Sequence, residues 1–277
     1  RRVLFRSQLM PDIARRLAGM DFDDYEAVEH ASAAIRAAIQ EAPVPEDLLA
    51  EIRAQIQALR SGPGDDPFVA VRSSVAVKDS AISSFPGMMD TYHFIRGEQD
   101  IVAHIRQCWA SLYTARAATR RHQLNVGQDR GVIAPVVQRM VDADVAGVLF
   151  TANPVTSARE EMVIESNWGL GESVVSGEVN ADHFVVARRD PPSIKERKIQ
   201  HKSFRVSLDR ERGLGRKKYP LDGNRATQSS LTDQQVFEIA ALGEKIEVVF
   251  SQPQDVEWAY EGGLLFVLQS RSIKGLR

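Results

Sequence analysis

Near the end of the chain, two acidic residues, an amide and an arginine have the types and spacing of a phosphate and metal site. Asp255 and Glu257 lie two residues apart in one strand-like run, and Gln269 and Arg271 lie two apart in the next. Residues two apart in a strand project from the same face of a sheet. Carboxylate oxygens are ligands that magnesium prefers, and a guanidinium neutralises phosphate oxygens. The spacing therefore predicts a site for a polyphosphate bound with magnesium.

The two runs are expected to form a β-hairpin. They are joined by Glu261-Gly262-Gly263, and three-residue loops that contain Gly are common hairpin connections. This loop predicts pairing of Tyr260 with Leu264, and hence of Asp255 with Gln269. The opposite face is then expected to pack on a core through its apolar residues. Those residues are Val256, Trp258, Tyr260, Phe266 and Leu268.

Composition and charge exclude several classes of protein. The 277 residues are 43% hydrophobic and 26% charged, which is typical of one large or two modest globular domains. The net charge is -2, with basic and acidic residues interspersed, so we expect no nucleic-acid partner. No apolar run reaches the roughly 20 residues of a membrane span, and no signal-peptide pattern is present. We expect a cytoplasmic protein in which the single Cys108 is a packing residue.

Hydrophobic periodicity predicts the elements that position the site. Helices are predicted over residues 11–60, divided in two at Pro43 and Pro45, over residues 99–122, and over residues 233–250 behind a capping box of Thr232 and Gln235. Strands are predicted over residues 68–74, 161–165, 183–187 and 194–201, and a second hairpin over residues 132–141 and 145–151. Residues 80–90 are predicted to be a loop. This irregular order favours an α+β fold with mixed or antiparallel sheets.

Six short segments share their order and spacing with one enzyme family. They are Val71-Arg72-Ser73-Ser74, Ser84-Phe85-Pro86-Gly87-Met88-Met89-Asp90-Thr91, Val136-Val137-Gln138-Arg139-Met140-Val141, Ala146-Gly147-Val148-Leu149-Phe150-Thr151-Ala152-Asn153-Pro154, Trp168-Gly169-Leu170-Gly171-Glu172 and Leu268-Gln269-Ser270-Arg271. Together they resemble the nucleotide-binding domain of the phosphoenolpyruvate synthase, pyruvate phosphate dikinase and rifamycin phosphotransferase family. The resemblance covers about residues 12–273. It is specific for the family and does not select one member.

The resemblance implies an ATP-grasp-like fold in which two subdomains close on ATP and Mg²⁺. We expect these subdomains at residues 1–130 and 131–277. By matching motif positions, Arg72 resembles the family's arginine that contacts the nucleotide phosphates. Gly87 and Thr91 fall in the loop that folds over those phosphates in the family. The strand bordering the adenine is matched by Gln138, Met140 and Val141.

In the second subdomain, the resemblance assigns roles to the four polar residues of the hairpin. Glu257 resembles a magnesium ligand, supported by Asp255. Gln269 and Arg271 resemble phosphate contacts, and Gln269 is also counted with the metal ligands. Arg72 and Arg271 are thereby the catalytic candidates.

Each role has an alternative that the sequence leaves open. Arg271 could form only a surface ion pair with Asp255 or Glu257, which contributes little. Arg72 could pair with Asp79, Met140 could be a core residue, and the glycines could serve tight turns. Glu165 is evenly balanced between a structural and a functional role. The histidines are interpreted as structural or surface residues: His30, His93, His104, His122, His183 and His201.

The chain also departs from the family pattern. The family opens with a Gly-Gly-Lys segment whose lysine reaches the nucleotide phosphates, and no such segment precedes the first predicted helix. Arg1-Arg2-Val3-Leu4-Phe5-Arg6-Ser7 resembles adapter read-through, so residues 1–9 are set aside and an N-terminally truncated fragment with weakened ATP affinity is expected. The family's swivelling phosphohistidine domain and acceptor-binding domain are expected on the full-length chain.

The first hypothesis is the ATP-binding domain of a dikinase-type phosphotransferase. In a phosphoenolpyruvate synthase, ATP, pyruvate and water give AMP, phosphoenolpyruvate and phosphate through a phosphohistidine on another domain. The alternatives within the family are the ATP-binding domains of rifamycin phosphotransferase and pyruvate phosphate dikinase. A hypothesis from another class is a catalytically inactive nucleotide-binding module. We expect the isolated fragment to be inactive.

Overall fold

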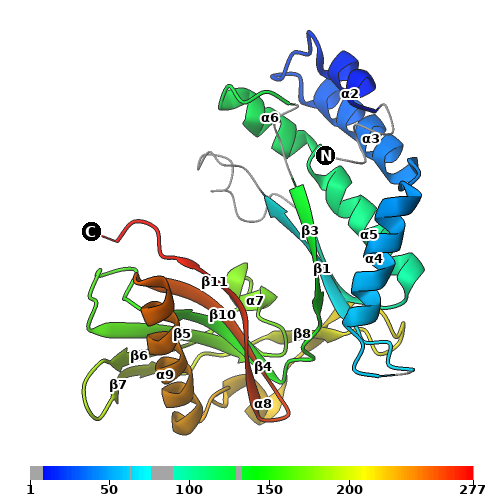
Figure 1. Cartoon of the computed structure of the whole chain (residues 1–277). Coiled ribbons are helices and arrows are strands. Elements are labelled where there is room, and N and C mark those ends of the chain that lie inside the picture. The colour runs from blue at the N-terminus through cyan, green and yellow to red at the C-terminus, as the bar shows by residue number, and fades with distance from the viewer. Residues whose placement is uncertain (1–8, 63, 76–89, 129–132, 277) are drawn as a thin grey trace. The chain divides into compact units, whose positions relative to one another are not determined.

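The chain forms two compact units, Arg1–Met140 and Val141–Arg277 (Figure 1). The computed structural model describes residues 9–62, 64–75, 90–128 and 133–276. Helices and antiparallel sheets occur together, which confirms the α+β class. The division between the units falls after Met140, because residues 133–139 pair within the first unit.

The first unit contains α2 (Leu9–Leu17), α3 (Tyr25–Glu41), α4 (Glu46–Ala58), α5 (Glu98–Ser111) and α6 (Ala115–Gln123). Its antiparallel sheet has the order β2-β1-β3, formed by β1 (Val69–Val75), β2 (Thr91–Ile95) and β3 (Ile133–Arg139). One face of this sheet is buried against α4 and α5, with Val69 and Val71 in the core beside Ile56 and Ile105. Strand periodicity leaves the side chains next to these valines on the opposite face.

Two predicted helices are divided in the structure. Residues 11–60 form three helices rather than two, because the chain turns at Gly19, whose φ of 71° ends α2, and α3 begins afresh at the N-cap Asp24. Residues 99–122 form α5 and α6 rather than one helix. The side chain of Thr114 accepts a hydrogen bond from the backbone N–H of Ala117, and this cap starts a new helix where the apolar pattern runs on.

The predicted hairpin of residues 132–141 with residues 145–151 is wrong. β3 pairs with β1, from Val69 opposite Arg139 to Val75 opposite Ile133. β4 (Val145–Phe150) pairs instead with strands of the second unit. A short apolar run predicts a strand but not its partner. Three strands of five residues each were not predicted from the sequence: β2, β8 (Phe204–Leu208) and β9 (Arg216–Pro220).

The second unit is built on a six-stranded antiparallel sheet in the order β11-β10-β4-β5-β6-β7. Besides β4, its strands are β5 (Glu161–Trp168), β6 (Asp182–Ala187), β7 (Ser193–Lys198), β10 (Gln254–Glu261) and β11 (Leu264–Ser272), and its helices are α7 (Glu172–Val175), α8 (Gly223–Thr227) and α9 (Asp233–Phe250). Helix α9 lies along one face, where Leu149, Phe184 and Trp258 form the core with Val236 and Ile239 (Figure 1).

Helix α9 begins as predicted. The Thr232 side chain accepts from the Gln235 backbone, and the Gln235 side chain accepts from the Thr232 backbone, which is the predicted capping box. The helix approaches the sheet closely at Gly243, where an added Cβ would lie 2.5 Å from Leu149 Cδ2. The start of α7 lies against the other face of the sheet, since an added Cβ at Gly171 would be 3.5 Å from Ala146 Cβ.

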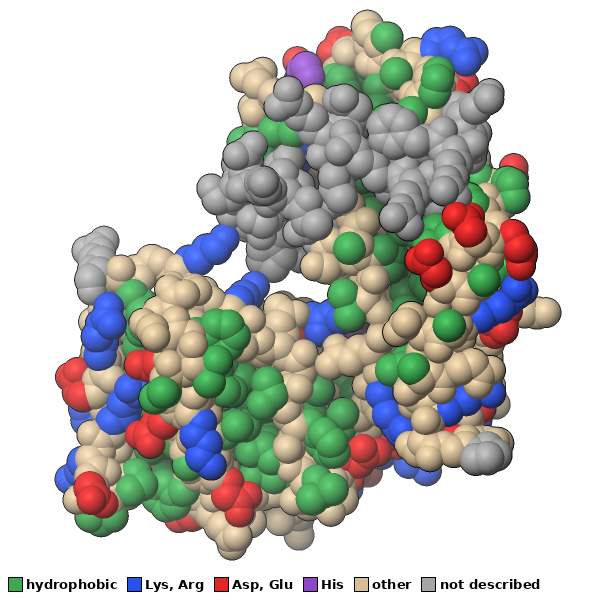
Figure 2. All heavy atoms as spheres, in the orientation of Figure 1, with side chains coloured by type: hydrophobic (Ala, Val, Ile, Leu, Met, Phe, Trp, Pro, Cys, Tyr) green, Lys and Arg blue, Asp and Glu red, His purple; other side chains and the backbone are tan. Residues whose placement is uncertain are grey.

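On the face shown in Figure 2, acidic and basic side chains are interspersed and form no large area of one sign. Among the helices of the described residues, none combines the length and apolar character needed to cross a bilayer.

Cys108 is a packing residue, as the sequence indicated. It is fully buried in the core of the first unit. Burial, with a smaller contribution from the charge of Asp90, raises the pKa of its thiol to about 12. Because the thiolate is the reactive form, we expect iodoacetamide at pH 8 to alkylate the native protein very slowly and the urea-unfolded protein readily. Rapid labelling of the native protein, measured by mass spectrometry, would show that this part of the fold is open.

Candidate nucleotide and metal site

The four polar residues of the C-terminal hairpin share one face of the six-stranded sheet. Asp255 lies directly opposite Arg271, and Glu257 lies directly opposite Gln269. Cross-strand partners in an antiparallel sheet project from the same face. The core face carries the intervening residues, including buried Val256 and Trp258. The structure therefore brings together all four residues that the sequence singled out in this hairpin.

The register of the hairpin differs from the predicted one. Its loop has two residues, Gly262 and Gly263, with φ of 56° and 81°, so that Glu261 rather than Tyr260 pairs with Leu264. A two-residue loop with positive φ at both positions matches the right-handed twist of paired strands. A bulge opposite the Glu257–Trp258 step then shifts the register once more. Each shift moves the pairing by one residue. The two shifts together leave Gln269 and Arg271 on the predicted face of the sheet but opposite different partners.

The same bulge corrects the predicted apolar face. Phe266 pairs with Ala259, so it lies on the polar side of the sheet rather than beside Trp258. Leu268 is the extra residue of the bulge, because Val267 faces Trp258 and Gln269 faces Glu257. The predicted positions of Phe266 and Leu268 are therefore wrong, while Val256, Trp258 and Tyr260 are in the core as expected.

Asp255 and Arg271 form an ion pair in this structure. Arg271 Nε and Nη2 donate to Asp255 Oδ2 at 2.8 and 2.7 Å. The Asp255 side chain is largely buried, whereas 48% of the Arg271 side chain is exposed. Such a pair contributes little to stability, but it orients the guanidinium on the polar face. The ion pair that the sequence offered as an alternative thus exists, and it leaves part of Arg271 accessible to a ligand.

Glu257 and Gln269 fit a magnesium ion that arrives with a nucleotide. Within residues 9–62, 64–75, 90–128 and 133–276, no three His, Cys, Asp or Glu side chains are grouped to hold a metal. Magnesium bound to nucleotides commonly takes only one or two protein carboxylates and completes its shell with phosphate oxygens and water. One carboxylate facing one amide oxygen is therefore a suitable donor set for such an ion.

In the first unit, three candidate residues share the face opposite the core. Arg72 lies opposite Thr91 on β2. Two residues before it, Ala70 pairs with Gln138 on β3. Since Ala70 and Arg72 are two apart, Arg72, Thr91 and Gln138 project from the same face. The structure thus groups the predicted phosphate residues Arg72 and Thr91 with the predicted adenine-bordering Gln138.

For the other candidates of this region, the structure gives only the backbone position or no description. The Met140 backbone N–H donates to the Phe68 carbonyl at 2.8 Å, so Met140 extends β3 by one step. Val141 is the first residue of the second unit. Gly87 and Asp79 lie outside the described residues, so neither the phosphate loop nor the alternative Arg72–Asp79 pair is described.

A row of cross-strand partners extends from the hairpin across the sheet. From β11 to β7 it consists of Gln269, Glu257, Val148, Glu165, His183 and Lys198. His183 Nδ1 lies 3.3 Å from Glu165 Oε1. From the sequence alone His183 is expected to be structural, since residues 18 positions apart reveal no contact until β5 and β6 are known to pair. The signal available in the sequence was their position at the ends of two predicted strands. Residues 161–165 end at Glu165, and residues 183–187 begin at His183.

Gly169 has a structural role of its own. Its φ is 76°, and an added Cβ would lie 2.2 Å from the Val206 carbonyl oxygen. The Leu170 N–H donates to that same carbonyl at 2.8 Å. Any side chain at position 169 would therefore displace β8, and this requirement exists whether or not a ligand is bound nearby.

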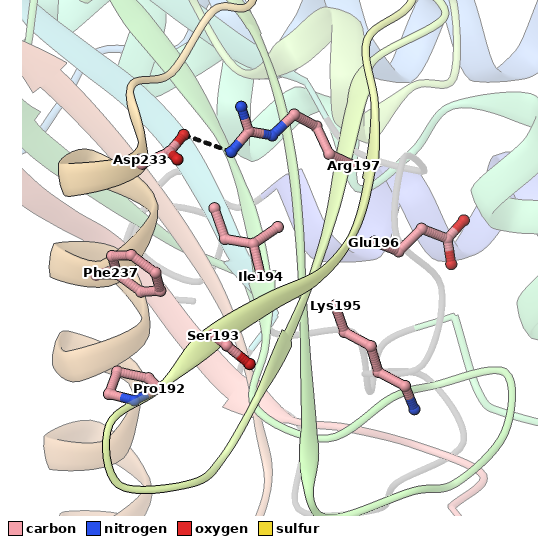
Figure 3. A pocket seen from close by; sticks show the side chains of 8 residues that line it. All are labelled: Pro192, Ser193, Ile194, Lys195, Glu196, Arg197, Asp233 and Phe237. Atoms are coloured by element: carbon pink, nitrogen blue, oxygen red, sulfur yellow. Dashed lines mark hydrogen bonds and ion pairs between the residues drawn. The ribbon is translucent and has the colours of Figure 1, made fainter.

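A groove lies apart from the candidate residues, between β7 and α9 (Figure 3). Ile194 and Phe237 meet at its centre, and Arg197 forms an ion pair with Asp233 across it. Lys195 and Glu196 point away from α9 (Figure 3). Ile194 and Phe237 pack against the core on the α9 side of the sheet, so the groove opens on the opposite face from Glu257.

Comparison with known proteins decides the family. Residues 1–277 match the family described as pyruvate phosphate dikinase, AMP/ATP-binding domain. The chain belongs to this family. The resemblance carried by the six sequence segments is thereby confirmed, and the chain is an AMP/ATP-binding domain of the dikinase type.

Relatives of this chain include two kinds of named enzyme. The chain is 38% identical over 264 residues to phosphoenolpyruvate synthase of Pyrococcus furiosus, covering 93% of the chain and 32% of that protein. It is 39% identical over 270 residues to a probable phosphoenolpyruvate synthase of Methanocaldococcus jannaschii, covering 97% and 22%. It is 35% identical over 276 residues to rifampicin phosphotransferase of a Streptomyces species, covering 100% and 31%. The chain thus spans a third or less of these relatives' length.

Proposed function

We propose that this domain binds ATP with magnesium and positions it for phosphoryl transfer within a larger, phosphoenolpyruvate synthase-like enzyme. The observation that carries the proposal is the pairing of Glu257 with Gln269 and of Asp255 with Arg271 on one face, in a chain that belongs to an AMP/ATP-binding family. In this account Glu257 and Gln269 hold the metal with Asp255 in support. Arg271 and Gln269 contact phosphate oxygens.

The first unit supplies the opposing half of the proposed site. Arg72 and Thr91 contact the phosphates together with Gly87, and Gln138, Met140 and Val141 border the adenine. The two units close on the nucleotide in an ATP-grasp-like manner. Catalysis by such a site consists of positioning and charge neutralisation, with the arginines Arg72 and Arg271 stabilising the charge on the transferred phosphoryl group.

The full-length enzyme then requires partners beyond this chain. A swivelling domain with a phosphorylated histidine accepts the phosphoryl group, and an acceptor-binding domain receives it from there. We propose pyruvate as the acceptor, and the support is that two relatives bear the name phosphoenolpyruvate synthase or probable phosphoenolpyruvate synthase. Rifampicin is the second candidate, because a relative of similar identity bears that name.

Radiolabelled ATP tests the phosphotransfer. The full-length protein is incubated with magnesium and ATP labelled at the β or the γ phosphorus, without acceptor, and the protein is separated from nucleotide. We expect labelled protein that loses its label when pyruvate is added. Retention of the label with pyruvate and its loss with rifampicin would select the second acceptor. Bound ATP without any labelled protein would overturn phosphotransfer and support an inactive nucleotide-binding module.

A further inference from the structure

Val136 is an exposed apolar side chain on the face of the first sheet that carries Arg72. It pairs directly with Arg72, which pairs in turn with Thr91 on β2, so the three side chains form one row across the sheet. Val136 is 42% exposed. Val137, the next residue along β3, packs against the core on the other face. Val136 therefore presents its methyl groups on the side of the sheet that the core does not cover.

Three neighbours of Val136 on this face have short side chains. Ala134 lies two residues before it on β3, and Ala70 and Ser74 lie on either side of its partner on β1. Cross-strand partners and residues two apart along a strand share a face. Side chains as short as those of alanine and serine do not extend over a neighbouring valine. A ligand on this face can therefore lie against Val136.

Val136 lies between the residues proposed for the two ends of the nucleotide. Arg72, proposed for the phosphates, is its cross-strand partner, at about 5 Å between Cβ atoms. Gln138, proposed to border the adenine, is two residues further along β3, at roughly 7 Å. In ATP the ribose joins the adenine to the phosphates. A nucleotide that contacts Arg72 and Gln138 at once therefore places its ribose over Val136.

We propose that Val136 packs against the ribose of the bound nucleotide and is a further binding residue of the first unit. The inference rests on the proposed function, since it adds a residue to the same site. The carbon skeleton of the sugar and the exposed methyl groups of Val136 both present apolar surface, and their contact removes that surface from water. The alternative is a valine that contacts no ligand, since single exposed apolar residues are common on protein surfaces.

Replacement of Val136 should weaken the binding of ATP but not the binding of its phosphates alone. Val136→Ala removes two methyl groups and should lower ATP affinity about fivefold, less than the full burial of both groups provides, because the ribose covers only their outer side. Inorganic tripolyphosphate has a chain of three phosphates like that of ATP but no nucleoside. Its affinity should therefore be the same for Val136→Ala and for the unchanged protein.

Both affinities are measured by calorimetry on the 277-residue chain with excess magnesium, for ATP by direct titration and for tripolyphosphate by displacement of ATP. The matched control is Val248→Ala, which removes the same methyl groups from an exposed position on α9. We expect this variant to bind both ligands as the unchanged protein does.

Equal ATP affinities of Val136→Ala, Val248→Ala and the unchanged protein would overturn the inference and leave the proposed function in place. So would equal losses of affinity for ATP and tripolyphosphate in Val136→Ala, because such losses show a change in the sheet or in Arg72 rather than a lost contact with the sugar. Failure of tripolyphosphate to displace ATP from the unchanged protein would also overturn it, since the phosphates would then not anchor the nucleotide beside Val136. Absence of ATP binding to the unchanged protein would overturn the proposed function, and this inference with it.

Discussion

Replacement of Glu257 by glutamine is expected to remove most of the magnesium-dependent part of ATP binding. Glu257 is the one carboxylate that faces Gln269 in the hairpin, and an amide of the same shape cannot supply its charge to the cation. Residues that stand behind a metal's ligands already change affinity by roughly 10- to 100-fold when replaced. A direct ligand should therefore lose at least about 100-fold, equivalent to about 2.7 kcal/mol.

The measurement is calorimetric titration of ATP into the 277-residue chain with magnesium and with excess chelator. Glu244→Gln is the matched control, because it removes the same charge from an exposed position on α9. We expect Glu257→Gln to bind ATP equally weakly in both buffers and Glu244→Gln to behave as the unchanged protein does. A Glu257→Gln protein that retains a full magnesium effect would show that the cation is held elsewhere.

Replacement of Lys202 by methionine is expected to cost about 3 to 5 kcal/mol of unfolding free energy, the usual effect of breaking a buried ion pair from one side. The side chains of Lys202 and Asp182 are both fully buried, with Nζ 2.7 Å from Oδ1. Asp182 also accepts from the Gln200 N–H at 2.9 Å and from the N–H and hydroxyl of Ser230 at 2.7 and 2.8 Å. Methionine leaves this carboxylate buried without a countercharge.

Urea unfolding followed by tryptophan fluorescence measures the loss, since Trp258 is buried in the same unit. The matched control is Lys217→Met, whose amine forms an exposed ion pair with Glu211; it should change stability by less than about 1 kcal/mol. The expected loss at Lys202 is a large part of the roughly 5 to 15 kcal/mol that holds a domain folded. Equal effects of the two substitutions would mean that the buried pair contributes no more than a surface pair.

The face of the C-terminal hairpin could be predicted from the sequence, although its register could not. Side chains alternate with a period of two in each strand, so Asp255 and Glu257 had to share a face, as did Gln269 and Arg271. Which residues stand opposite depends on the loop and on any bulge. The two-residue Gly262–Gly263 loop and the bulge at Leu268 each shifted the pairing by one, and neither is marked in the apolar pattern.

Pairings between distant segments could not be predicted at all. Residues 133–139 were correctly expected to be a strand, but their partner is β1, more than fifty positions earlier, rather than the adjacent β4. Local sequence specifies the conformation of a strand, whereas its partner is chosen by the packing of the whole unit. For the same reason, the contact between His183 and Glu165 became visible only when β5 and β6 were placed side by side.

The central claim is that Glu257 and Gln269 hold the magnesium of a bound nucleotide. A crystal structure of the chain grown with manganese and a non-hydrolysable ATP analogue tests it most directly, because manganese replaces magnesium and its anomalous scattering locates the ion. We predict an anomalous peak between the Glu257 carboxylate and the Gln269 amide oxygen, with phosphate oxygens completing the shell. An ion and nucleotide bound away from this hairpin, for example in the groove between β7 and α9, would contradict the account.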